Sequence, residues 1–158
     1  MHSIKRGFTL VELLIVIAIL AILSTLGLSN FQSSRIKARD LSRKSDLQTI
    51  AKSLEAYVND HRSYPLSNPD GEIICKTTTP PECAWGEAFT DDNGTIYASV
   101  LPSDASGFTY WYTSDGSYYR LYAHLENSAD NAIDTEITQT CGSSTAICNY
   151  QITSSNIQ

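Results

Sequence analysis

A long apolar run near the start of the chain limits most strongly what this sequence can become. From Leu10 to Leu28 only Glu12, Ser24 and Thr25 are strongly polar. The run is close to the roughly 20 residues with which an α-helix crosses a bilayer. A carboxylate inside a membrane costs a few kcal/mol, so a plain anchor would avoid Glu12. The run therefore predicts a membrane helix with a further task for Glu12.

Charge divides the chain into two parts. Up to Arg62 there are nine Lys and Arg and five Asp and Glu, whereas from Ser63 onward there are two and twelve, giving balances of +4 and −10. Basic residues before the apolar run place Met1–Gly7 in the cytoplasm and the rest outside. A cleaved secretory signal is the alternative, but the run is long and no Ala-x-Ala site follows it. The acidic second part argues against a nucleic-acid partner.

All four cysteines lie in the acidic part, and they allow three connectivities. The close spacing favours Cys75–Cys83 and Cys141–Cys148, which an exported domain would form as disulfides. A zinc site with all four as ligands is the alternative, although the spacings are wider than usual for zinc.

The stretch from Lys5 to Glu12 reads KRGFTLVE. It resembles the leader junction of the type IV pilin and type II secretion pseudopilin family, in which a short basic leader ends in Gly and is followed by Phe, Thr, two apolar residues, Glu and an apolar helix. The resemblance is strongest over Lys5–Leu28. The sequence departs from many members in having Gly27 and Ser29, and no proline, about twenty residues into the mature helix.

The resemblance implies roles for three residues. A prepilin peptidase would cut after Gly7 and methylate the new amino group of Phe8. Glu12 would then pair with the Phe8 amino group of a neighbouring subunit in a filament. A buried charge is tolerable when it is paired, and this cation exists only after cleavage.

Helical periodicity continues beyond the apolar run. No Gly or Pro occurs between Ser29 and Tyr64, and one apolar stripe follows helical spacing: Leu47, Ile50, Ala51, Leu54, Tyr57 and Val58. We expect a helix from Phe8 to about Asp60, ending before Pro65, with the stripe packed on a folded domain. The basic stretch Arg35–Lys52 reads as a solvated face, or as one that meets lipid headgroups or neighbouring subunits.

The acidic part predicts a small antiparallel sheet. Phe108–Thr113 and Tyr118–Leu125 flank an Asp-Gly turn and read as a β-hairpin. Alternation along the second strand favours packing of Tyr119, Leu121, Ala123 and Leu125 against the helix. A later strand fits Ile147–Thr153. The fold class is therefore α+β.

Little in the sequence suggests chemistry. No recognisable catalytic set or phosphate loop is present, so we expect no enzyme. Calcium is the one cofactor with some support, because Asp130, Asp134 and Glu136 form an acidic loop placed where some pseudopilins hold calcium. The acidic turn at Asp91–Gly94 fails the EF-hand pattern. Solvated turns are the alternative for both.

These observations predict four segments: a leader (1–7), a transmembrane and assembly helix (8–30), its amphipathic continuation (31–62) and an exported globular domain (63–158). The favoured function is a type IV pilus subunit, held in the inner membrane and then assembled with its own copies into an extracellular filament by pilus machinery. A type II secretion pseudopilin, in a periplasmic pseudopilus, is the first alternative. The second is a membrane-anchored binding protein, with a ligand surface on the aromatic residues Tyr110, Trp111, Tyr112, Tyr118, Tyr119 and Tyr122.

Overall fold

A computed structural model describes residues 7–79, 81–142 and 145–154 of the chain. These residues fall into two compact units, which divide between Ala38 and Arg39. The division lies inside the helix, whereas the shift in charge along the sequence lies after its end.

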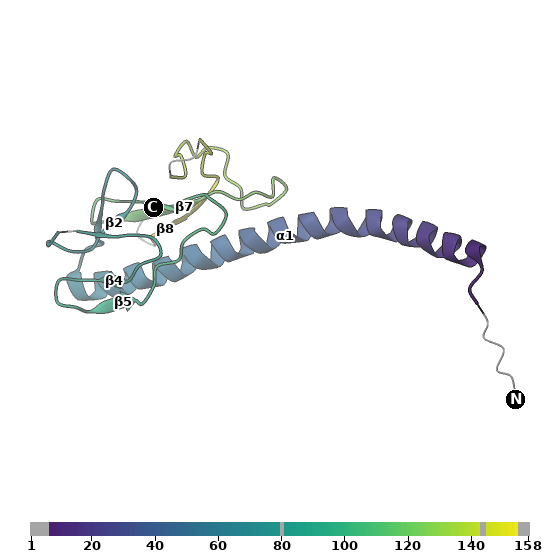
Figure 1. Cartoon of the computed structure of the whole chain (residues 1–158). Coiled ribbons are helices and arrows are strands. Elements are labelled where there is room, and N and C mark those ends of the chain that lie inside the picture. Colours follow the sequence, from purple (N-terminus) through teal and green to yellow (C-terminus); the bar gives the residue numbers. More distant parts are fainter. Residues whose placement is uncertain (1–6, 80, 143–144, 155–158) are drawn as a thin grey trace, which may run out of the picture. The chain divides into compact units, whose positions relative to one another are not determined.

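One helix, α1, runs through Leu10–His61 (Figure 1). The prediction of a helix from Phe8 to about Asp60 is thus confirmed to within two residues at either end. Its backbone stays helical at Gly27. The helix ends where Arg62 adopts a left-handed φ of 61°, two residues before Tyr64-Pro65, which cannot continue a helix.

The first unit consists of the N-terminal part of α1. Its large apolar side chains between Leu10 and Leu23 are exposed, from 45% at Val16 to 79% at Leu10. No helix in the described part of the chain meets the length and hydropathy criteria for a membrane span.

The second unit packs three small antiparallel sheets around the C-terminal part of α1 (Figure 1). The first sheet has the order β1-β2-β3 and the second pairs β4 with β5, while the third has the order β6-β7-β8. The strands are β1 (Leu66–Ser67), β2 (Ile73–Ile74), β3 (Glu82–Cys83), β4 (Phe89–Thr90), β5 (Ile96–Ala98), β6 (Trp111–Ser114), β7 (Tyr119–Ala123) and β8 (Tyr150–Thr153). The predicted α+β class is confirmed.

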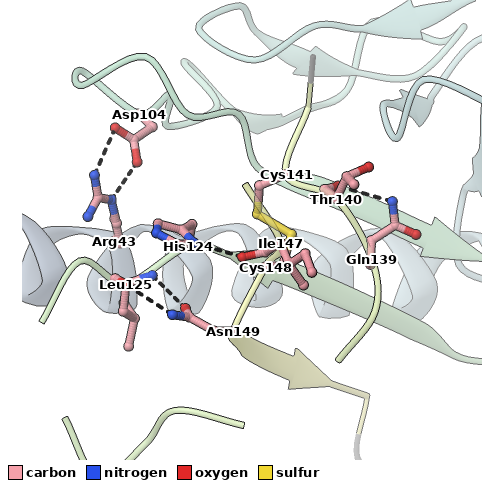
Figure 2. Close-up of a disulfide and its surroundings, with 10 residues drawn as sticks. All are labelled: Arg43, Asp104, His124, Leu125, Gln139, Thr140, Cys141, Ile147, Cys148 and Asn149. Carbon is pink, nitrogen blue, oxygen red and sulfur yellow. Dashed lines mark hydrogen bonds and ion pairs between the residues drawn. A yellow bond between two sulfur atoms is a disulfide. The ribbon is translucent and has the colours of Figure 1, made fainter. Parts of the chain in front are cut away.

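The predicted hairpin is β6–β7, with Ser114 opposite Tyr119 across the Asp-Gly turn. The last strand is shorter than expected, because β8 begins at Tyr150 rather than at Ile147. Just before β8, the side-chain amide of Asn149 accepts the Leu125 N–H at 2.6 Å and donates to the Leu125 carbonyl at 2.9 Å (Figure 2). At this point, hydrogen bonds of the side chain of Asn149 therefore take the place of the backbone hydrogen bonds of a regular β-ladder.

The core forms where the apolar stripe of α1 meets the sheets. Leu47, Ile50 and Leu54 are fully buried, and Ala51, Tyr57 and Val58 pack against them, as the periodicity predicts. Across from the helix lie the inward residues of β7, Tyr119, Leu121 and Ala123. Burial of these side chains is what attaches α1 to the sheets, since each contributes about 1.5–3 kcal/mol when large and apolar.

The outer face of β7 carries a second, smaller cluster in which Tyr122 packs with Cys141 and Cys148. Both expected disulfides, Cys75–Cys83 and Cys141–Cys148, are formed. Around the second one, the Ile147 carbonyl accepts a hydrogen bond from His124 Nδ1 at 2.7 Å (Figure 2). The disulfide therefore closes the C-terminal loop on itself, and the hydrogen bond from His124 fastens that loop to the end of β7.

Candidate processing and assembly site

Gly7 and Phe8 flank the predicted cleavage point. Gly7 and Phe8 lie in a non-helical segment just before α1. Gly7 has no neighbour within 4 Å of where a Cβ would stand, and Phe8 is 83% exposed. The Gly7–Phe8 peptide bond is therefore open to a protease in the described residues. The rest of the predicted leader, with Lys5 and Arg6, lies outside them.

Thr9 and Glu12 close the start of α1 as a capping box. Oε2 of Glu12 accepts the Thr9 N–H at 2.9 Å and the Thr9 hydroxyl at 2.7 Å. In return the Glu12 N–H reaches Thr9 Oγ1 at 3.3 Å. Helix starts leave four N–H groups without helical partners, and this reciprocal arrangement satisfies two of the donors there. Glu12 thus has a role within a single chain that the sequence reading above did not assign.

This geometry also presents a negative charge at the helix N-terminus. Both Thr9 donors approach the same oxygen of the carboxylate, Oε2. An ammonium group could therefore bind on the side of Oε1 without breaking the cap. A carboxylate at this end is further stabilised by the helix dipole.

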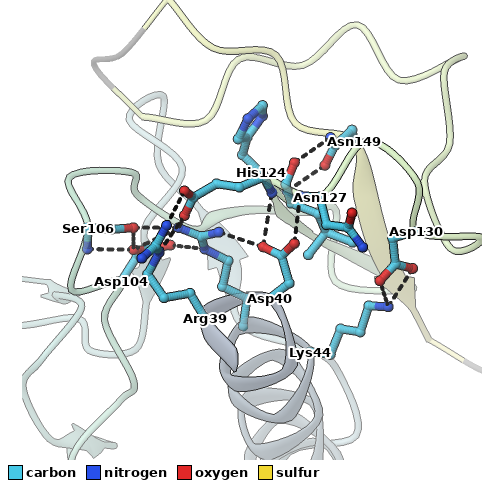
Figure 3. A network of polar contacts seen from close by, with 12 residues as sticks. Arg39, Asp40, Lys44, Asp104, Ser106, His124, Asn127, Asp130 and Asn149 are labelled. Atoms are coloured by element: carbon cyan, nitrogen blue, oxygen red, sulfur yellow. Dashed lines mark hydrogen bonds and ion pairs between the residues drawn. The ribbon is translucent and has the colours of Figure 1, made fainter. Parts of the chain in front are cut away.

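A buried ionic network of the second unit is centred on Arg43 of α1. Figure 3 shows this network through its labelled members Asp40, Asp104 and Ser106. The Arg43 side chain is 2% exposed and pairs with Asp40 at 2.7 Å, Asp104 at 2.5 Å and Glu126 at 2.7 Å. It also donates to the hydroxyl of Ser106. Loops that follow residue 103 and residue 125 are therefore tied to one helix position.

Neighbouring helix residues extend this network. Arg39 pairs with Glu126, and Lys44 pairs with Asp130 at 2.7 Å. The Asp40 carboxylate accepts two backbone N–H groups, from Glu126 at 2.9 Å and from Asn127 at 2.8 Å. The hydrogen bond from Arg39, together with Arg43, lowers the pKa of Glu126 to about 2.

A second polar contact joins the end of α1 to the β4–β5 turn. His61 Nε2 lies 3.1 Å from Asp91 Oδ2, and its ring stacks on Tyr57 with centroids 4.1 Å apart. Burial alone would raise the pKa of Asp91, but hydrogen bonds from Thr95, His61 and Asn93 lower it to about 2.

The acidic loop does not gather its carboxylates around one point. Asp130 is engaged by Lys44. Asp134 accepts the Glu136 N–H at 2.9 Å and the Gln151 amide at 3.2 Å. Within residues 7–79, 81–142 and 145–154, no group of three or more His, Cys, Asp or Glu side chains is placed to hold a metal ion.

The aromatic residues of the hairpin are mostly core. Tyr110, Tyr112, Tyr119 and Tyr122 are buried, whereas Tyr118 is 41% exposed. Three of the six residues suggested as a ligand surface, Tyr110, Tyr112 and Tyr119, are at most 1% exposed and are therefore unavailable to a ligand.

Sequence reasoning missed the capping box and the Arg43 network. A signal existed for both. Thr-x-x-Glu before an apolar run is the pattern of a capping box. Arg39 and Arg43 lie at helical spacing from the buried stripe that begins at Leu47. Charged side chains on a buried helix face need partners of opposite charge inside the protein, so this spacing was a signal for acidic partners.

Comparison with known proteins identifies the family. Residues 3–28 match the model of the prokaryotic N-terminal methylation motif. The chain is 32% identical to type II secretion system core protein G of Dickeya chrysanthemi over 77% of its length and 76% of the relative's. It is 30% identical to the core protein G of Escherichia coli K12, covering 84% and 87%. No solved structure matches the chain.

A pilus protein is among the relatives as well. The type IV wide pilus major component PilA4 of Thermus thermophilus is 32% identical over 78% of this chain and 92% of its own length. The chain belongs to the type IV pilin and type II secretion pseudopilin family. Its members named here are structural proteins, and most are secretion core protein G.

Replacing Arg43 tests the ionic network. Arg43→Met should lower the free energy of unfolding by about 3–5 kcal/mol, because it leaves the buried Asp40 and Asp104 carboxylates without their cation. Urea unfolding followed by tryptophan fluorescence measures this, since Trp85 and Trp111 both lie in the second unit. Lys52→Met, which removes an exposed cation from the same helix, is the control and should change stability by about 0.5 kcal/mol or less. Equal effects of the two changes would contradict the network.

Acid should weaken the second unit. The pKa values of Glu126 and Asp91 are lowered to about 2 in the folded chain, below their ordinary values of 4.5 and 3.8. Both carboxylates therefore stabilise the fold when the pH lies above their ordinary pKa values. This contribution is lost as the pH falls from about 4 to about 2. Melting temperatures should drop across that range. The double variant Asp91→Asn, Glu126→Gln should show a smaller drop, and an unchanged pH profile would refute this assignment.

Proposed function

We propose that the chain is a structural subunit of a type II secretion pseudopilus. The sequence alone favoured a surface pilus, but the core protein G relatives support the pseudopilus better. The pilus relative PilA4 keeps the surface filament as a second candidate. In either case the chain waits in the inner membrane as a single-pass protein and then assembles with its own copies through secretion or pilus machinery.

Maturation would occur at the exposed Gly7–Phe8 bond. A prepilin peptidase would hydrolyse this bond and methylate the new amino group. The match to the methylation motif supports this step, as does the open setting of Gly7.

Assembly would then use the exposed apolar surface of the first unit. The side chains from Leu10 to Leu23 expose about half or more of their area and need lipid or other copies to cover them. Within that surface, Glu12 would receive the methylated Phe8 amino group of a neighbour. Because the two Thr9 donors bind Oε2, a neighbour's ammonium approaching Oε1 would add to the cap instead of replacing it.

The intact mass of the chain, measured in cell membranes and in material sheared from the cell surface, tests both its processing and its final location. The chain should be found as Phe8–Gln158 plus one methyl group and less four hydrogens for two disulfides, in membranes of native cells. Enrichment in material sheared from the cell surface would favour the surface pilus, and confinement to the cell envelope would favour the pseudopilus. An unprocessed chain, or one cut near Gly27, would overturn the filament proposal.

Two variants separate the roles of Glu12. Glu12→Gln keeps a capping side chain, since Gln also serves at this position, but it removes the charge. We therefore expect normal cleavage, at least tenfold weaker association of each subunit, equal to about 1.4 kcal/mol of lost pairing, and a correspondingly lower yield of filaments. Thr9→Ala keeps the charge and breaks the cap, at a cost of about 1 kcal/mol in helix stability. Filament yield after shearing, normalised to mature protein, should be much lower for Glu12→Gln than for Thr9→Ala, and the reverse order would show that capping is what assembly requires.

A further inference from the structure

A polar groove lies on the face of the third sheet that points away from α1. Its floor is formed by two cross-strand pairs of β7 and β8, Arg120 with Thr153 and Tyr122 with Gln151. Its wall is the segment 134–139. The groove has a volume of about 480 Å³, within the range of about 300–1,000 Å³ typical of small-molecule sites.

The side chains of the groove combine all classes of hydrogen-bonding group. Arg120 only donates, the carboxylates of Asp134 and Glu136 only accept, and the amides of Gln139 and Gln151 do both. Arg120 is exposed and belongs to none of the ion pairs in the described residues. Its guanidinium lies 5.9 Å from the centre of the Tyr118 ring.

This mixture argues against charged and apolar ligands. Two carboxylates beside Arg120 would repel an anion, and a metal cation would find no group of three or more carboxylate, imidazole or thiolate ligands in the described residues. An apolar ligand would leave the polar groups without partners, at a cost for each one. A neutral ligand with many hydroxyl groups meets none of these penalties, because each hydroxyl both donates and accepts.

Addition of a peptide strand along β8 is disfavoured by the same wall. The Asp134 N–H donates to the Asn149 carbonyl at 2.8 Å, and its carboxylate holds the Gln151 amide at 3.2 Å. Segment 134–139 therefore already occupies the edge at which β8 begins. Recognition in the groove has to use side chains instead of a free strand edge.

We propose that this groove binds a neutral saccharide. Arg120 and the Gln139 and Gln151 amides donate to ring and hydroxyl oxygens, while Asp134 and Glu136 accept from the hydroxyl groups. The affinity should be weak, with a Kd on the order of 1 mM for a short oligosaccharide, because the site is open and its contacts replace contacts with water.

The test uses the full-length mature chain in a zwitterionic detergent that carries no sugar head group. Maltotriose and chitotriose are the saccharide probes, and binding is followed by saturation-transfer NMR with titration. Arg120→Met and Glu136→Gln should each weaken binding about tenfold. Lys76→Met and Glu87→Gln remove one cation and one carboxylate outside the groove and should leave binding unchanged. Melting curves establish that all four variants fold.

Other outcomes overturn the proposal. Inorganic phosphate and a capped Ala-Gln-Ala peptide are tested alongside the sugars. Preferential binding of phosphate would indicate an isolated arginine site, and preferential binding of the peptide would indicate a polypeptide groove. Absence of saccharide binding by the wild-type chain, or equal loss in the control variants, would also reject it. None of these results depends on whether the chain forms a pilus or a pseudopilus.

Discussion

The buried side chain of Arg43 sets how the second unit is put together. It lies on the same face of α1 as Leu47, Ile50 and Leu54, one turn before the first of them. The apolar residues of this face attach the sheets, but non-directional packing would tolerate a shift along the helix. The guanidinium does not tolerate one, because its bonds to Asp104 and Glu126 have fixed geometry. Hydrophobic burial therefore supplies most of the attraction, and we infer that the ion network selects one register.

The two parts of α1 differ in whether their apolar side chains are covered by the rest of the chain. The C-terminal part finds cover within its own chain, whereas side chains from Leu10 to Leu23 do not. Glu12 lies within this uncovered stretch, but Thr9 already provides it with hydrogen bonds inside the same chain. The Glu12 carboxylate of a free subunit therefore already has hydrogen-bond partners within its own chain. Under the proposed processing after Gly7, a neighbour's new amino group would meet an acceptor that the cap has already oriented.

Local patterns in the sequence predicted local structure well. Helix length, the Leu47–Val58 stripe, the Asp-Gly hairpin and both disulfides follow from periodicity or short spacing, and the structure confirms them. The ionic network could not be predicted in the same way, because Arg43 meets partners 61 and 83 residues away. The calcium site suggested at the acidic loop stays a prediction, and contacts of this loop also reach far along the chain. Its first carboxylate, Asp130, is bound by Lys44 from α1, 86 residues earlier.

The same long-range contacts change the meaning of the charge asymmetry. A basic helix followed by an acidic domain suggested two parts in different surroundings. Three of the six basic residues in Arg35–Lys52 instead pair with acidic residues of the domain, namely Arg39, Arg43 and Lys44. Part of the asymmetry is therefore complementarity within one folded unit. The exposed cations of this stretch that remain, Arg35, Lys37 and Lys52, are the ones still available to lipid headgroups or to the acidic surface of another copy.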